Sequence, residues 1–142
     1  MIYIGADHKG FNLAASSEDN LLKNGYNVEN LSKEVDPNND YVDEAVKLTS
    51  KMTNQDLGIL ICGTGIGMSI AANKVKGIRA AKCDNTLEAK LCKEHNNANV
   101  ICFSSSKSIE EIFEMTKIFL STPFSNEERH IRRVAKIINL ER

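Results

Sequence analysis

The chain has no tryptophan, only two prolines and an aromatic fraction of 6%. It also lacks any apolar run near the roughly 18–20 residues that a membrane-spanning helix needs, so we expect no membrane partner. Its first residues are typical of a strand and lack the basic region and long apolar stretch of a secretory signal, which predicts a cytoplasmic location. With 18 basic and 19 acidic residues, the net charge of -1 gives no indication of a nucleic-acid partner.

What is present is ordinary for a folded protein. The 142 residues include 42% hydrophobic and 26% charged residues, which argues against extensive disorder. A chain of this length fits one domain and leaves little room for a second. We therefore expect a single domain over residues 1–142.

The four cysteines include no Cys-x-x-Cys pair, and their spacing matches no zinc-site pattern. We accordingly expect no zinc site made of these cysteines, and no motif in the chain leads us to expect another metal or a cofactor. In a reducing compartment Cys83, Cys92 and Cys102 are expected to be small buried side chains. Cys62 differs from them because a glycine-rich segment follows it.

Short β-type runs alternate with amphipathic helical patterns along the chain. We expect strands near residues 1–5, 26–31, 57–62, 78–83 and 99–103. We expect helices near residues 11–24, 40–54, 68–75, 86–94, 108–121 and 126–140. This rhythm predicts an α/β fold, a three-layer αβα sandwich with a five-stranded parallel, Rossmann-like sheet and an extra C-terminal helix.

The glycine-rich segment is the most informative local feature. It comprises Gly63, Thr64, Gly65, Ile66 and Gly67, with a helix expected to start at one of the last two. Alternate glycines leave the main-chain N–H groups open to a phosphate or an oxyanion, and the helix start adds positive potential. The segment matches neither a P-loop nor a dinucleotide fingerprint. A plain strand-to-helix turn is the alternative.

Cys62 immediately precedes this segment, where main-chain dipoles favour a thiolate. A thiolate can act as a nucleophile or as a base. The alternative is a buried structural thiol, which the sequence alone leaves open.

Ligands of parallel sheets collect at the carboxyl ends of the strands. Asp7 and His8 follow the first predicted strand, and His95 and Asn96 precede the fifth. We expect both imidazoles, those of His8 and His95, to lie at the carboxyl ends beside the glycine segment. Either histidine alone would more often be a surface group.

The last predicted helix carries a cationic stripe made of Arg129, Arg132, Arg133 and Lys136. Arg129 and Arg133 are one turn apart and suit a phosphate dianion. The alternative is a solvated face balanced by two neighbouring glutamates. A terminal amphipathic helix of this kind often packs on a partner subunit.

Taken in order, five blocks resemble the ribose-5-phosphate isomerase B family, which also holds allose-6-phosphate and galactose-6-phosphate isomerases. The blocks are GADHKGF at 5–11, ICGTGIGMSIAANK at 61–74, GIRAA at 77–81, HNNANV at 95–100 and RHIRRV at 129–134. The resemblance spans essentially the whole chain. It implies a metal-free aldose–ketose isomerase that acts on a sugar phosphate through a cis-enediol, as a homodimer with shared active sites. A tetramer is the alternative, and the sequence does not decide between them.

By the same resemblance, Cys62 is the base that moves the proton between C1 and C2, and His95 is the acid that helps to open the sugar ring. The remaining assignments concern substrate binding. Asp7 and His8 would bind the sugar hydroxyls and ring oxygen, residues 63–67 the enediolate oxygens, and Asn96, Arg129 and Arg133 the rest of the substrate and its phosphate.

The chain departs from the family pattern in three places. Val42 replaces a proline, and Ala14 replaces a lysine of the first helix. Ser106 stands where a phosphate-binding arginine is expected, and the neighbouring Lys107 offers only a point charge.

These departures leave other functions open. The main prediction is the interconversion of ribose 5-phosphate and ribulose 5-phosphate. The alternatives are an isomerase of allose 6-phosphate or galactose 6-phosphate, and a non-catalytic sugar-phosphate-binding subunit of a hetero-oligomer. A nucleotide-binding module is disfavoured by the glycine spacing.

Overall fold

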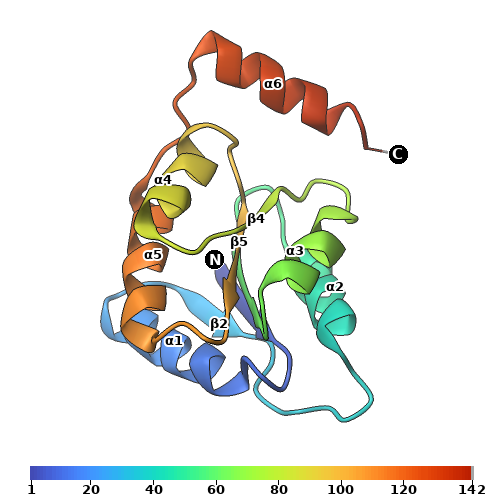
Figure 1. The fold of residues 1–142 in the computed structure, drawn as a ribbon, viewed down its shortest axis with the longest axis vertical. Coiled ribbons are helices and arrows are strands. Elements are labelled where there is room, and N and C mark those ends of the chain that lie inside the picture. The colour runs from blue at the N-terminus through green and yellow to red at the C-terminus, as the bar shows by residue number, and fades with distance from the viewer. Residues whose placement is uncertain (142) are drawn as a thin grey trace.

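The computed structural model describes residues 1–141, which form a five-stranded parallel sheet with helices on both faces (Figure 1). The strands are β1 (Ile2–Ala6), β2 (Val28–Asn30), β3 (Leu57–Cys62), β4 (Ala80–Lys82) and β5 (Val100–Ser104). Their order across the sheet is β2-β1-β3-β5-β4, with every neighbouring pair parallel. The predicted α/β fold is confirmed.

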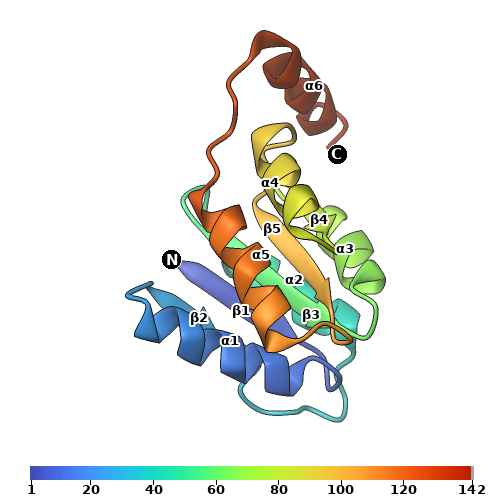
Figure 2. The ribbon, with the colours of Figure 1, turned by 60° about the vertical axis from the view of Figure 1, so that its left-hand side comes forward.

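Two layers of helices enclose the sheet. They are α1 (Phe11–Lys23), α2 (Tyr41–Lys51), α3 (Ile66–Asn73), α4 (Thr86–Glu94), α5 (Ile109–Ser121) and α6 (Glu128–Ile138). Helices α1, α4 and α5 pack together on one face, and α2 packs against α3 on the other. Helix α6 lies beyond one end of the sheet, past the end of α4 (Figure 2).

Alternate side chains of the central strands pack into two separate hydrophobic cores, one on each face of the sheet. Ile59 and Ile61 of β3 point to the face covered by α1, α4 and α5, where Phe103 and Phe119 are also buried. Leu60 of β3 points to the opposite face, against α2 and α3. Burial on both faces explains why these strands are apolar throughout.

Local signals set most helix boundaries. Asp40 is the N-cap of α2, accepting the N–H of Val42, while Asp43 reaches back to the N–H of Asp40 in a capping box. The helix predicted at 86–94 has those bounds. Strands β2 and β4 are shorter than predicted, with three residues each, because they form the two edges and each has only one neighbour.

Because all strands run in the same direction, the polar segments lie at the two opposite ends of the strands: the carboxyl edge and the amino edge of the sheet. At the carboxyl edge Cys62 pairs with Ser104, and the glycine segment follows. At the amino edge Val100 begins β5, and α6 lies beyond this edge. Within residues 1–141 no helix combines the length and apolar character needed to cross a membrane.

Candidate active site

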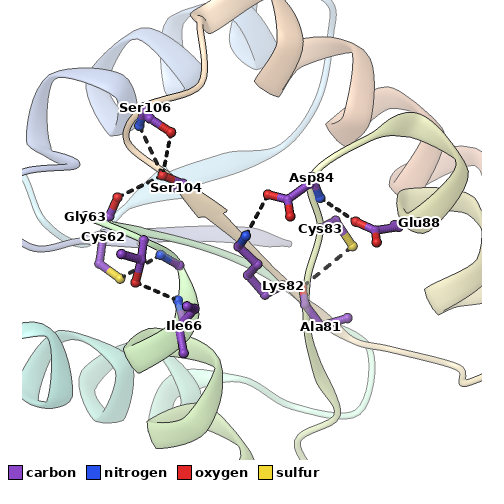
Figure 3. Close-up of polar contacts among 12 residues, drawn as sticks. Cys62, Gly63, Ile66, Ala81, Lys82, Cys83, Asp84, Glu88, Ser104 and Ser106 are labelled. Atoms are coloured by element: carbon purple, nitrogen blue, oxygen red, sulfur yellow. Dashed lines mark hydrogen bonds and ion pairs between the residues drawn. The ribbon is translucent and has the colours of Figure 1, made fainter.

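The sulfur of Cys62 faces the glycine segment. The side chain is only 4% exposed, and Sγ accepts the N–H of Gly65 at 3.2 Å. Figure 3 shows Sγ beside the loop that leads into Ile66, the first residue of α3. The expected helix start is thereby confirmed, and the thiol lies against main-chain donors while its stem joins the apolar core below α2 and α3.

The loop is open to a further acceptor. Thr64 accepts the N–H of Ile66 through its own hydroxyl. Within residues 1–141 the N–H groups of Gly63, Thr64 and Gly67 have no acceptor. Donors left free at a helix N-terminus suit an anionic oxygen, as the sequence predicted.

Glycine is required at two of these positions. Gly65 has a φ of +78°, and a Cβ there would lie 3.0 Å from the carbonyl carbon of Phe103. A Cβ on Gly67 would lie 2.6 Å from the ring of Tyr41, which covers this side of the loop. The glycines therefore let the loop pack against β5 and α2 while its N–H groups stay accessible.

Asp7 and His8 lie at the same edge, after β1. Asp7 accepts the N–H groups of Lys9 and Gly10 at 2.9 and 3.1 Å, which fixes the turn that carries the exposed His8. A cavity of about 180 Å³ opens beside them. Lys9 also matters, since its Nζ lies 3.7 Å from where a Cβ on Gly63 would be, so it brings a cation to the loop that the sequence reasoning did not single out.

The segment after β5 borders the loop from the other side (Figure 3). Ser104 donates to the carbonyl of Gly63 at 2.8 Å, and Ser106 lies 2.8 Å from the same Ser104 hydroxyl. Lys82 pairs with Asp84 at 2.6 Å, and this bond lowers the pKa of the Asp84 carboxyl. Ser106 thus braces the loop through Ser104.

The other predicted residues gather at the opposite edge. His95 caps the end of α4, and Asn96 follows it, ahead of β5. Our expectation that His95 lies at the carboxyl ends was wrong, because a residue preceding a parallel strand lies at its amino end. β5 has five residues, so at about 3.3 Å each about 15 Å separates the two edges.

Helix α6 supplies the cations of this second group. Arg129 and Arg133 are exposed, and Arg129 pairs with Glu127. A cavity of about 920 Å³ opens between the end of α6 and the turn after α3, with Asn96 on its wall. Cys62 lines neither this cavity nor the smaller one. The predicted site residues of the chain therefore form two separate groups, or predicted half-sites: Asp7, His8 and Cys62 with the glycine loop at one edge, and His95, Asn96, Arg129 and Arg133 at the other.

Two residues that the sequence reasoning left aside support the second half-site. The ring of His130 lies 4.4 Å from that of His95, and Ser125 bonds its Nδ1 at 2.6 Å. Burial and the neighbouring Arg129 lower the pKa of His130. Arg79 donates to the carbonyl of Asn97, a residue with a φ of +49°, and so holds the turn after His95. His130 and Arg79 both lie in sequence blocks that resemble the isomerase family, and this was the signal by which the sequence could have identified them.

The remaining cysteines agree with the expectation for them. All four cysteines are free and buried. Burial raises the pKa of the Cys102 thiol, which keeps it neutral. Among residues 1–141 no group of three or more His, Cys, Asp or Glu side chains is arranged to hold a metal ion.

Comparison with known proteins gives one consistent result. A family model described as Ribose/Galactose Isomerase matches residues 2–137. A probable ribose-5-phosphate isomerase B of Mycoplasma genitalium is 40% identical over 99% of this chain and 95% of its own length. The ribose-5-phosphate isomerase B of Escherichia coli is 35% identical over 99% and 95%.

Solved structures agree in fold. A crystal structure of the Mycoplasma genitalium ribose-5-phosphate isomerase B with bound ribulose-5-phosphate has a TM-score of 0.91 and 40% identity, covering 98% of this chain and 94% of that one. A ribose 5-phosphate isomerase from Thermotoga maritima also has a TM-score of 0.91, with 41% identity and 97% of both chains covered. On this evidence of sequence and fold together, the chain belongs to the ribose/galactose isomerase family.

Proposed function

We propose that the protein interconverts ribose 5-phosphate and ribulose 5-phosphate through a cis-enediol. Membership of the family supports an aldose–ketose isomerase, and the relatives named above are ribose-5-phosphate isomerases. The observation that carries the mechanism is the placement of Cys62 Sγ within 3.2 Å of the Gly65 N–H, beside free main-chain donors.

In the proposed reaction the Cys62 thiolate removes the proton from C2 of the open-chain aldose and returns it to C1, while the proton of the C2 hydroxyl passes to the oxygen at C1. One base on one face of the enediol suffices, because the two carbons are adjacent. Negative charge develops on the oxygens at C1 and C2 during this transfer. Several kcal/mol of stabilisation would come from the N–H groups of Gly63, Thr64 and Gly67. Gly65 and Ile66 shape the same loop.

Ring opening needs an acid and groups that orient the sugar. Asp7 and His8, at the carboxyl edge with Cys62, would bind the hydroxyls and the ring oxygen. His95 would be the acid, yet the length of β5, about 15 Å, separates its edge of the sheet from that of Cys62 in the same chain, and proton transfer needs an approach of about 3 Å. We therefore propose a homodimer in which a second copy brings its own amino edge to this site.

Such a partner would also supply the phosphate site. Asn96, Arg129 and Arg133 share the amino edge with His95, so they would arrive together. Arginine side chains one turn apart can grip a phosphate through paired hydrogen bonds, and this remote binding energy orients the sugar. Lys107 or Ser106 would assist from the first protomer. No metal is required by this scheme.

The test is turnover of ribose 5-phosphate by the purified protein, with and without EDTA. We expect activity in both, and a loss of about 10²- to 10⁴-fold in Cys62→Ala. Cys92→Ala is the matched control, since Cys92 is also free and buried but lies in α4, away from the loop. Full activity in Cys62→Ala would exclude Cys62 as the base.

A six-carbon sugar phosphate is the second candidate, because the matching family model covers galactose as well as ribose isomerases. Comparison of kcat/KM for ribose 5-phosphate, allose 6-phosphate and galactose 6-phosphate decides between them. We expect the highest value with ribose 5-phosphate.

A further inference from the structure

The loop that joins β2 to α2 forms one wall of the 180 Å³ cavity beside Asp7 and His8. Glu44, in the first turn of α2, also lines this cavity. Its side chain is only 6% exposed, whereas most acidic side chains of the protein face solvent. A buried carboxylate is costly unless its oxygens are paired, so its contacts indicate what it holds in place.

Glu44 binds both ends of that loop. The hydroxyl of Ser32, at the start of the loop, donates to Oε1 at 2.7 Å. The side-chain amide of Asn39, at the end of the loop, donates to Oε2 at 3.1 Å. Lys47, one turn further along α2, lies 3.0 Å from Oε1 and balances the charge. The carboxylate therefore clamps the two ends of the cavity wall.

Ser32 links the Glu44 carboxylate to the end of β1 through hydrogen bonds of its hydroxyl group. Its oxygen accepts the N–H of Ala6 at 3.0 Å, while its single proton is committed to Glu44. β2 stops at Asn30, and the last main-chain bond on that side runs from Leu31 to Ile4. Ser32 thus replaces the ladder bond that a longer β2 would give to Ala6, the residue directly before Asp7.

We propose that Glu44 is a positioning residue for the sugar end of the substrate. Through Ser32 it fixes the end of β1 from which Asp7 and His8 project, and through Asn39 it holds the loop that encloses the same cavity. The inference rests on the proposed function, because it assigns this cavity to the sugar rather than to its phosphate. Glu44 itself does not touch the reacting atoms.

The experiment separates the two ends of the substrate. Glu44→Gln keeps the side-chain volume but replaces the charged acceptor shared by Ser32, Asn39 and Lys47 with a neutral amide, so the charge-assisted bonds of the clamp are lost. We expect kcat/KM for ribose 5-phosphate to fall by about 10- to 100-fold, the usual range for loss of one charged hydrogen bond. Competitive inhibition by inorganic phosphate, which probes the proposed phosphate site and not the sugar end, should change by less than about twofold.

Thr49→Val is the matched control. Thr49 is buried in the same helix, but its hydroxyl bonds only within α2, to the carbonyls of Ala45 and Val46. We expect this variant to lower the melting temperature without changing KM. If Glu44→Gln does not fold, Asn39→Ala removes one end of the clamp at a half-buried side chain and should raise the KM for ribose 5-phosphate alone.

The outcomes are distinct. If the wild-type protein does not turn over ribose 5-phosphate, the proposed function is wrong. If it does, and both Glu44→Gln and Asn39→Ala keep the wild-type kcat/KM, Glu44 has no positioning role. Equal weakening of sugar phosphate and inorganic phosphate would also overturn the inference, because it would show a general loss of structure.

Discussion

The separation of the two predicted half-sites gives a sharp test of the proposed shared active site. Cys62→Ala should inactivate one half-site, and His95→Ala the other, so neither variant should be active alone. In a dimer that contains one chain of each kind, one site receives both substitutions. The second site then combines an intact Cys62 from one chain with an intact His95 from the other.

The size of the effect follows from two-fold symmetry. Random mixing makes about half of the dimers mixed, and each mixed dimer has one intact site of two, so we expect about a quarter of the wild-type activity. A site contained within a single chain would instead give no recovery at all. Cys62 pairs with Ser104 at the end of β5, whereas His95 precedes its start, about 15 Å away.

The assay needs the two variants unfolded together in denaturant, refolded as a mixture, and compared with each variant refolded alone. Turnover of ribose 5-phosphate is measured at equal total protein. A control mixture of wild type with Cys62→Ala should keep about half of the wild-type activity, and wild type refolded alone reports the loss caused by refolding itself. A mixture of the two variants that stays as inactive as its components would refute the shared site, and with it the proposed role of His95.

Two further predictions concern the loop and the stacked histidines. Gly65→Ala should lower the free energy of unfolding by more than about 1–3 kcal/mol, the usual cost of a strained backbone, because its φ is +78° and its Cβ would also meet the main chain of Phe103. Gly25→Ala is the control, since Gly25 has a similar φ of +83° but open space around it, and should cost only about 1–2 kcal/mol. Urea unfolding measures both, and equal costs would contradict the packing argument. Since burial lowers the pKa of His130 below its ordinary 6.5, the unfolded chain takes up this proton more readily than the folded protein, so stability should be retained above pH 6.5 and fall as the pH drops below it. Melting temperatures of wild type and His130→Gln at pH 7.5 and 5.5 check this, and an identical pH dependence in both proteins would exclude the contribution of His130.

Local sequence signals accounted for much of the fold. The boundaries of α4 and the cap of α2 were predictable because Asn85 and Asp40 bond main-chain donors within a few residues of themselves. The apolar runs of β1, β3 and β5 were equally clear, since burial on both faces demands them. β2 and β4 were predicted too long, because their ends depend on which strand lies beside them, and that is a property of the whole sheet.

The arrangement of the site divided in the same way. The sequence alone predicted the position of the loop with Cys62, Gly65 and Ile66, because the end of a strand and the start of a helix depend on neighbouring residues in the chain. The position of His95 was not, although its place before β5 already implied the amino edge. Only the packed structure set His130 against His95 and joined Glu44 to Ser32 and Asn39, because these contacts arise between elements that bury side chains against each other.

The amino-acid sequence alone was enough to predict the groups that the proposed chemistry needs: a thiol, a loop of free main-chain donors, imidazoles and a pair of arginines. Tertiary structure decided how these groups are divided, since a parallel sheet sends residues after its strands to one edge and residues before them to the other. The chain order of His95 and β5 therefore keeps His95 and Cys62 apart within one protomer.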